Sequence, residues 1–252
     1  MGSIVMQPPL LIQLSADDPL PSPHTAWGPH SPAPGLLAIG GGLSVPRLLQ
    51  AYSQGCFPWY SAGQPVMWWC TDPRMVLNVD EFQLHRSYKK LLKRLLETNR
   101  LQILIDQDFL GTITLCAHLP RKGQSGTWIV HDMVQAYTQL HAQGHAHSIQ
   151  AWVDGQLAGG LYCVSIGRAV FGESMFSHQT DGSKLALAAL VAMCRAEQAP
   201  WIDCQQHTSH LASLGAKPIP RPVFLDHVDT AIKLPALPWK FESIYWKFLG
   251  ID

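Results

Sequence analysis

The alternation of apolar and polar positions is most informative between residues 169 and 206. Residues 169–176 (AVFGESMF) have strand character, and apolar residues at helical spacing then run from Ser183 until Pro200 ends them. Residues 201–205 (WIDCQ) form a short apolar run bounded by turn signals, which is typical of a buried strand. The pattern therefore predicts a strand, a helix and a second strand in succession.

Three polar residues interrupt this apolar unit: Glu173, Asp203 and Gln205. Side chains two positions apart on a strand point to the same face, so Asp203 and Gln205 are expected to lie together, with Cys204 directed away from them into the core. A buried strand seldom carries an acid and an amide. The three groups are either an internal hydrogen-bond network or a reaction centre.

The segments before this unit complete an antiparallel meander. Strands are expected over residues 148–153, 156–165 and 169–176, with Asp154-Gly155 as the hairpin turn between the first two. Trp128 to Gln143 is expected to be an amphipathic helix that leads into the meander.

A second amphipathic helix is expected over residues 84–100, and its polar face is strongly basic, with no acid before Glu97. Such a face is either solvated surface or a binding face for phosphates. The basic residues are Arg86, Lys89, Lys90, Lys93 and Arg94.

Proline and aromatic residues dominate the N-terminal part. Residues 7–35 are rich in proline and predict an irregular arm along the body, and a short helix is expected over Val45 to Gln54. Trp59 and the pair Trp68-Trp69 follow, with Arg74 close behind. Aromatic residues of this density are either core or a stacking platform for a ring, with Arg74 beside it for a phosphate or carboxylate.

Composition narrows the class of protein. The 252 residues are 47% hydrophobic and 14% charged, which indicates a globular chain, and the formal net charge of zero leaves only a local patch for nucleic acid. Six cysteines without a CxxC pair favour reduced thiols and a cytoplasmic location. No apolar run is long enough for a membrane span, and a metal site at the His141 to His147 cluster is not expected.

The order of expected elements resembles the Gcn5-related N-acetyltransferase fold. The resemblance implies an α+β protein: a small N-terminal domain over residues 1–78, and an acetyltransferase-like domain over residues 79–252 with a central, mostly antiparallel sheet flanked by helices and with a C-terminal extension. That fold normally holds acetyl-CoA in a glycine-containing loop at a helix start. Here the loop 177–183 lacks the paired small residues and carries Asp181, so the coenzyme A site looks absent.

Longer motifs are similar to those of the leucyl/phenylalanyl-tRNA–protein transferases, in family order from about residue 35 to 225. The departures are Gly42 for an acid, Cys70-Thr71 for Ser-Pro, Gln150 for Glu, and a tail beyond about residue 232 with no matching counterpart. The matching stretches are GLLAIGGGLSVPRLLQAYSQGCFPWY, WWCTDPR, GTWIVHDMVQAY, GHAHSIQAW, AGGLY, FGESMFS and IDCQQHTSHLASLGA.

The resemblance implies an aminoacyltransferase that moves Leu or Phe, and Met less well, from aminoacyl-tRNA to the N-terminal Arg or Lys of acceptor proteins, marking them for N-degron proteolysis. No metal and no cofactor is implied, and we expect a cytoplasmic monomer. Rival hypotheses are a coenzyme A-dependent N-acetyltransferase, a non-catalytic tRNA- or peptide-binding module, and a transferase with other donors or acceptors.

The resemblance also assigns roles. Asp203 and Gln205 fall in the catalytic centre, where a carboxamide is a weak base but orients an amine or oxyanion well, and Asp203 would hold Gln205. Glu173 is either a structural acceptor or the anion that attracts a cationic substrate end. Trp59 and Trp128 would flank the terminal adenosine, and Arg74 and the basic helix would hold tRNA phosphates. The expected donor side-chain pocket comprises Leu161, Val170, Met175, Leu187, Leu190 and Cys194.

Overall fold

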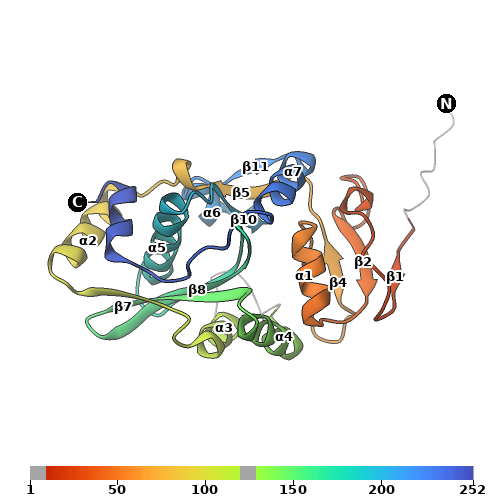
Figure 1. Cartoon of the computed structure of the whole chain (residues 1–252), viewed down its shortest axis with the longest axis horizontal. Helices are drawn as coiled ribbons and strands as arrows, with labels where there is room; N and C mark the ends of the chain where they lie inside the picture. The colour runs from red at the N-terminus through yellow and green to blue at the C-terminus, as the bar shows by residue number, and fades with distance from the viewer. Residues whose placement is uncertain (1–9, 120–128, 252) are drawn as a thin grey trace.

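The large sheet has seven strands in the order β11-β5-β10-β9-β8-β7-β6, and a smaller sheet has the order β1-β2-β4-β3. Figure 1 shows the computed structural model, which describes residues 10–119 and 129–251, with the smaller sheet and α1 beside one end of the large sheet. The protein is therefore a mixed α/β structure, and one pair of strands in the large sheet, β9 and β10, is parallel.

The predicted meander is confirmed. Strands β7 (Ala146–Val153), β8 (Gln156–Ile166) and β9 (Ala169–Ser177) pair antiparallel, and β6 (Leu101–Ile105) extends the sheet beyond β7. The turn between β7 and β8 is Asp154-Gly155, where both residues have positive φ, as a tight hairpin requires.

The other half of the sheet is built from distant segments. Strand β10 (Trp201–Gln205) runs parallel to β9 through only two registered residues, and it pairs antiparallel with β5 (Arg74–Asn78). Strand β11 (Lys217–Ile219) closes this edge. Strand β5 belongs to the large sheet, so a domain boundary at residue 78 would assign one strand of that sheet to the N-terminal domain. The division into two domains itself stays a prediction.

Helices cover both faces of the large sheet (Figure 1). On one face, α5 (Gly182–Ala196), α2 (Arg86–Glu97) and the final 3-10 segment η3 (Ser243–Leu249) share an apolar cluster with the sheet. Helix α5 approaches closely at its start, because a Cβ on Gly182 would lie 1.9 Å from the carbonyl oxygen of Ala158 on β8. The start of α5 is thereby fixed against the meander.

The opposite face carries α3 (Phe109–His118) and α4 (His131–Ala142), which share a second apolar cluster with the N-terminal elements. Those elements are β1 (Gln13–Leu14), η1 (Pro23–Thr25), β2 (Leu36–Gly40), α1 (Val45–Ser53), β3 (Phe57–Pro58) and β4 (Met67–Trp69). The remaining elements are η2 (Val79–Glu81), α6 (Ser209–Ser213) and α7 (Arg221–Ala231). The continuous cluster joins the smaller sheet to the large one.

Helix starts follow the sequence signals. Ser44 caps α1 by accepting from the Arg47 N–H, and α1 lies where the short helix was predicted, whereas α4 begins at His131 rather than at Trp128. No helix in the described part of the chain is long and apolar enough to cross a membrane.

Candidate active site

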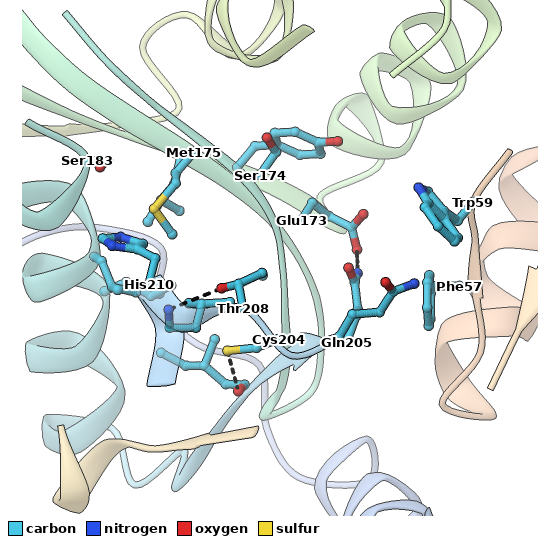
Figure 2. A pocket seen from close by; sticks show the side chains of 18 residues that line it. Phe57, Trp59, Glu173, Ser174, Met175, Ser183, Cys204, Gln205, Thr208 and His210 are labelled. Carbon is cyan, nitrogen blue, oxygen red and sulfur yellow. Dashed lines mark hydrogen bonds between the residues drawn. The ribbon is translucent and has the colours of Figure 1, made fainter. Parts of the chain in front are cut away.

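A cavity of about 710 Å³ opens where β9 and β10 diverge, between these strands, α5 and β3. Figure 2 shows Glu173 and Gln205 pointing toward one another, with Phe57 and Trp59 beside them and with Met175 and His210 further away. The cavity is lined by Phe57, Trp59, Leu161, Tyr162, Gly172, Glu173, Ser174, Met175, Ser183, Leu187, Leu190, Ile202, Cys204, Gln205, Gln206, Thr208, His210 and Leu211.

Hydrogen bonds converge on Glu173. Gln205 Nε2 donates to Glu173 Oε1 over 2.8 Å, and the Tyr52 hydroxyl donates to the same oxygen over 2.7 Å. The Tyr137 hydroxyl lies 3.4 Å from Glu173 Oε2 and in short hydrogen-bond contact with the Tyr52 hydroxyl. Three elements, α1, α4 and β10, thus hold one buried carboxyl group.

Burial raises the pKa of Glu173 from 4.5 to about 8; Asp203 adds to the rise, while the hydrogen bonds from Tyr52 and Tyr137 and the charge of Arg74 oppose it. At pH 7 this carboxyl group is mostly protonated. The raised pKa and the three hydrogen-bonding neighbours favour the interpretation of Glu173 as a buried hydrogen-bonding group near neutral pH, and its interpretation as the anion that attracts a cationic substrate end stays a prediction.

Gln205 is positioned by a bulge. The register of β10 against β5 shifts between Asp203 and Gln205, and Gln205 has a φ of 61°. Because of this bulge, Cys204 and Gln205 both line the cavity, whereas Asp203 faces away from it. The expectation that Asp203 and Gln205 share a face with Cys204 in the core is wrong, since a bulge interrupts the two-residue period.

Asp203 forms a buried ion pair with Arg74. The carboxylate accepts from Arg74 Nε over 2.7 Å and from Arg74 Nη2 over 2.6 Å, and the two side chains are 2% and 0% exposed. Asp203 Oδ1 also accepts the N–H of Gln205 over 2.9 Å, so Asp203 does hold Gln205. Arg74 cannot reach a tRNA phosphate, and its assignment as a phosphate contact is wrong.

Most of the predicted pocket lines the cavity: Leu161, Met175, Leu187 and Leu190 do, whereas Val170 and Cys194 lie buried in the apolar cluster behind it. Sequence patterns gave no reason to add Ile202 or Leu211, because each is an ordinary core residue by its spacing. Phe57, which also lines the cavity, belongs to the same dense aromatic run as Trp59. Tyr52 and Tyr137 were also missed. The sequence hints at them only through Glu173, because a buried carboxyl group needs hydrogen-bond donors around it.

The structure describes one of the two tryptophans predicted to stack on the adenosine, and all five predicted basic residues of α2. Trp59 lies at the cavity and is 38% exposed, while Trp128 falls outside the described residues. The five basic residues of α2 are all exposed, with Lys93 4.0 Å from Glu97, so the face is open to solvent. It lies beyond α5 as seen from the smaller sheet (Figure 1).

The chain matches two family models: residues 76–229 match the leucyl/phenylalanyl-tRNA protein transferase model, and residues 41–72 match the model of the N-terminal domain of the same family. A relative from Polaromonas sp. is 57% identical over 93% of this chain and 92% of its own length, and one from Leptothrix cholodnii is 54% identical over 96% and 95%. A relative from Burkholderia pseudomallei is 52% identical over 91% and 90%. All three are named leucyl/phenylalanyl-tRNA–protein transferase.

Proposed function

The chain belongs to the leucyl/phenylalanyl-tRNA–protein transferase family, and we propose that it moves Leu or Phe, and Met less well, from aminoacyl-tRNA to the N-terminal Arg or Lys of acceptor proteins. The new peptide bond would mark the acceptor for N-degron proteolysis. We propose further that the enzyme acts as a monomer in the bacterial cytoplasm, without a cofactor.

The observation that carries this proposal is a large, mainly apolar cavity that ends at a polar network. Met175, Leu187 and Leu190 offer an adaptable apolar wall for a Leu or Phe side chain. A donor seated there would bring its ester to Gln205 and Glu173, where the acceptor amine must also arrive. The donor pocket of the proposal is the predicted one without Val170 and Cys194.

The chemistry needs positioning more than a strong base. An α-amine has a pKa near 8, so about a tenth is neutral at pH 7, and it attacks the ester carbon while the bond to the tRNA 3′ oxygen breaks and that oxygen takes a proton. Because Gln205 Nε2 donates to Glu173, the carboxamide oxygen is turned away from this bond and is available to accept from the amine. Holding amine and ester together can contribute on the order of 7 kcal/mol.

The acceptor's cationic side chain needs an anion, and Glu173 is mostly neutral. Among the described residues near the cavity, Asp203 is paired with Arg74 and Asp181 with Lys184. Asp132 differs: it is exposed in the first turn of α4, and its charge adds to the burial that raises the pKa of Tyr60, the neighbour of Trp59, to about 12. We assign Asp132 to the acceptor's Arg or Lys side chain.

For the tRNA, we propose that Trp59 stacks on the terminal adenosine, which would contribute about 1–3 kcal/mol per base. The assignment of Trp128 to the same adenosine stays a prediction, because Trp128 lies outside the described residues. Phosphates of the acceptor stem would lie on the α2 face formed by Arg86, Lys89, Lys90, Lys93 and Arg94. Their exposure supports this assignment.

We propose that the large sheet is of the Gcn5-related N-acetyltransferase type, supported by the order meander, α5, β10, α6 and β11. The coenzyme A alternative is disfavoured by the start of α5. There the Ser183 N–H is already bonded to the Ser177 hydroxyl, and Asp181 places a carboxylate beside the helix start.

Transfer of labelled Leu from Leu-tRNA to two peptides, one beginning with Arg and one with Met, tests the function. We expect label on the Arg peptide alone. No transfer with Leu, Phe or Met donors, while tRNA still binds, would instead establish a non-catalytic binding module. Asp203→Ala sharpens the distinction, because a binding module would have no turnover to lose.

A further inference from the structure

The backbone of Gln205 is held in a conformation that it would not adopt unaided. Its φ of 61° lies in the left-handed region, which residues other than glycine seldom occupy. Such a backbone persists where the surroundings fix it, and it is common at functional sites. The orientation of the carboxamide toward Glu173 depends on this conformation, because a regular strand would turn Gln205 to the other face.

Both ends of the Gln205 backbone are bonded. Its N–H donates to Asp203 Oδ1 over 2.9 Å, and its carbonyl oxygen accepts from the Thr71 hydroxyl over 3.0 Å. Asp203 cannot turn away, because Arg74 holds both of its oxygens. Arg74, through Asp203, and Thr71 therefore act on the two peptide groups that flank the Cα atom of Gln205.

Arg74 is itself immobilised. Its guanidinium lies 4.6 Å from the ring centroid of Phe57 and 4.5 Å from that of Phe224. These rings come from β3 and α7, so the guanidinium joins the smaller sheet, the large sheet and a C-terminal helix. Neither Arg74 nor Thr71 lines the cavity, so neither touches a substrate there.

We propose that Arg74 and Thr71 are positioning residues that hold the Gln205 carboxamide in its reactive orientation, Arg74 through Asp203 and Thr71 through the Gln205 carbonyl. Only a planar, two-pronged cation can hold both oxygens of Asp203 in this way, so lysine is no substitute for Arg74. The kinetic part of this inference rests on the proposed transferase activity; the structural part does not.

Thr71→Val gives the mildest test, because it removes one hydroxyl and keeps the shape. We expect kcat for transfer to fall about ten-fold with KM for Leu-tRNA unchanged, since small misplacements at a reacting centre slow the chemical step more than binding. Thr71→Ser should restore most of the loss. Thr138→Val is the matched control: Thr138 is also half-buried and donates to a backbone carbonyl, that of Val134, away from the cavity.

Arg74→Lys should lower kcat further, by about a hundred-fold. The side-chain amide NMR signal of Gln205, identified by its loss in Gln205→Glu, should move in Thr71→Val and Arg74→Lys but not in Thr138→Val. An unmoved signal, or a kcat in Thr71→Val equal to that of Thr138→Val, would overturn the proposal. If the wild-type protein transfers nothing, the proposed function fails, and the NMR signal still decides the positioning role.

Discussion

At the residue scale, Glu173 combines deep burial with three hydrogen-bonding neighbours. Its pKa is raised from 4.5 to about 8, so the unfolded chain releases this proton at lower pH than the folded protein does. Between about pH 4.5 and pH 8 the unfolded chain binds fewer protons at Glu173 than the folded protein does. The contribution of Glu173 to the free energy of unfolding therefore falls as pH rises, by a few kcal/mol in total, and levels off above about pH 8.

Glu173→Gln removes this titration and keeps the shape. We expect the variant to gain stability relative to the wild type as pH rises from about 5 to about 8, measured by urea unfolding across that range. Parallel pH profiles for the two proteins would contradict the raised pKa. Glu97→Gln, at an exposed position on α2, serves as the control and should follow the wild type.

Asp132 gives a second prediction at this scale. Asp132→Asn should raise KM for a peptide beginning with Arg by about five-fold, with KM for Leu-tRNA unchanged, because an exposed or half-exposed ion pair is worth about 1 kcal/mol. Steady-state transfer kinetics with each substrate varied in turn measure this. Asp226→Asn on α7, an exposed acid in another helix, is the control. Equal KM values for all three proteins would remove Asp132 from acceptor recognition.

At the element scale, the C-terminal segment after α7 packs back on the body. The Trp239 ring stacks on His147 with centroids 3.9 Å apart and planes 4° apart, and the Tyr245 hydroxyl donates to Glu197 at the end of α5. Residues Ser243–Leu249 join the apolar cluster beneath α5. The tail that matched no family motif in the sequence thus supports the helix that lines the cavity.

Trp239→Ala should lower the free energy of unfolding by about 1–3 kcal/mol, since a stacked aromatic contact and its buried area are lost. Differential scanning calorimetry would show a drop in Tm of a few degrees. Phe248→Ala, in the same segment but 47% exposed, should change Tm little. Equal shifts in the two variants would show that the stack contributes nothing specific.

Elements with a strong local period were predictable, and the site geometry was less so. The meander and α5 follow from alternation, turn residues and helical spacing. Helix α3, strand β6 and helix α7 were not predicted, because their apolar patterns are short. The bulge at Gln205 could not be predicted either, because it arises from bonds to Asp203 and Thr71, and Thr71 is 134 positions away. A separation of 129 positions likewise hid the pairing of Arg74 with Asp203.

At the scale of the whole molecule, the basic face of α2 is separate from the cavity, because no residue of α2 lines the cavity. A tRNA that presents its end to Trp59 and its stem to α2 would reach across α5 (Figure 1). Such binding draws on phosphate contacts and should weaken steeply with salt. Because the formal net charge of the chain is zero, we propose that this local basic face makes the main electrostatic contribution to tRNA binding.

Replacing Lys89 and Lys90 with Gln together should weaken Leu-tRNA binding and make its salt dependence shallower by about 1–2 units of slope. Binding measured by fluorescence anisotropy at several salt concentrations tests this. Lys240→Gln, an exposed lysine on the C-terminal segment, is the matched control. A double variant that keeps the wild-type slope would show that this face does not contact phosphates.

The most direct test of the central claim is the intact mass of an Arg-initiated peptide after incubation with the protein, Leu-tRNA and acetyl-CoA in one tube. Family membership, the apolar cavity and the Gln205–Glu173 network predict a gain of one leucyl residue at the N-terminus. Gln205→Ala should greatly reduce the yield. A peptide that gains an acetyl group instead, or one whose mass is unchanged while Leu-tRNA remains intact, would contradict the account.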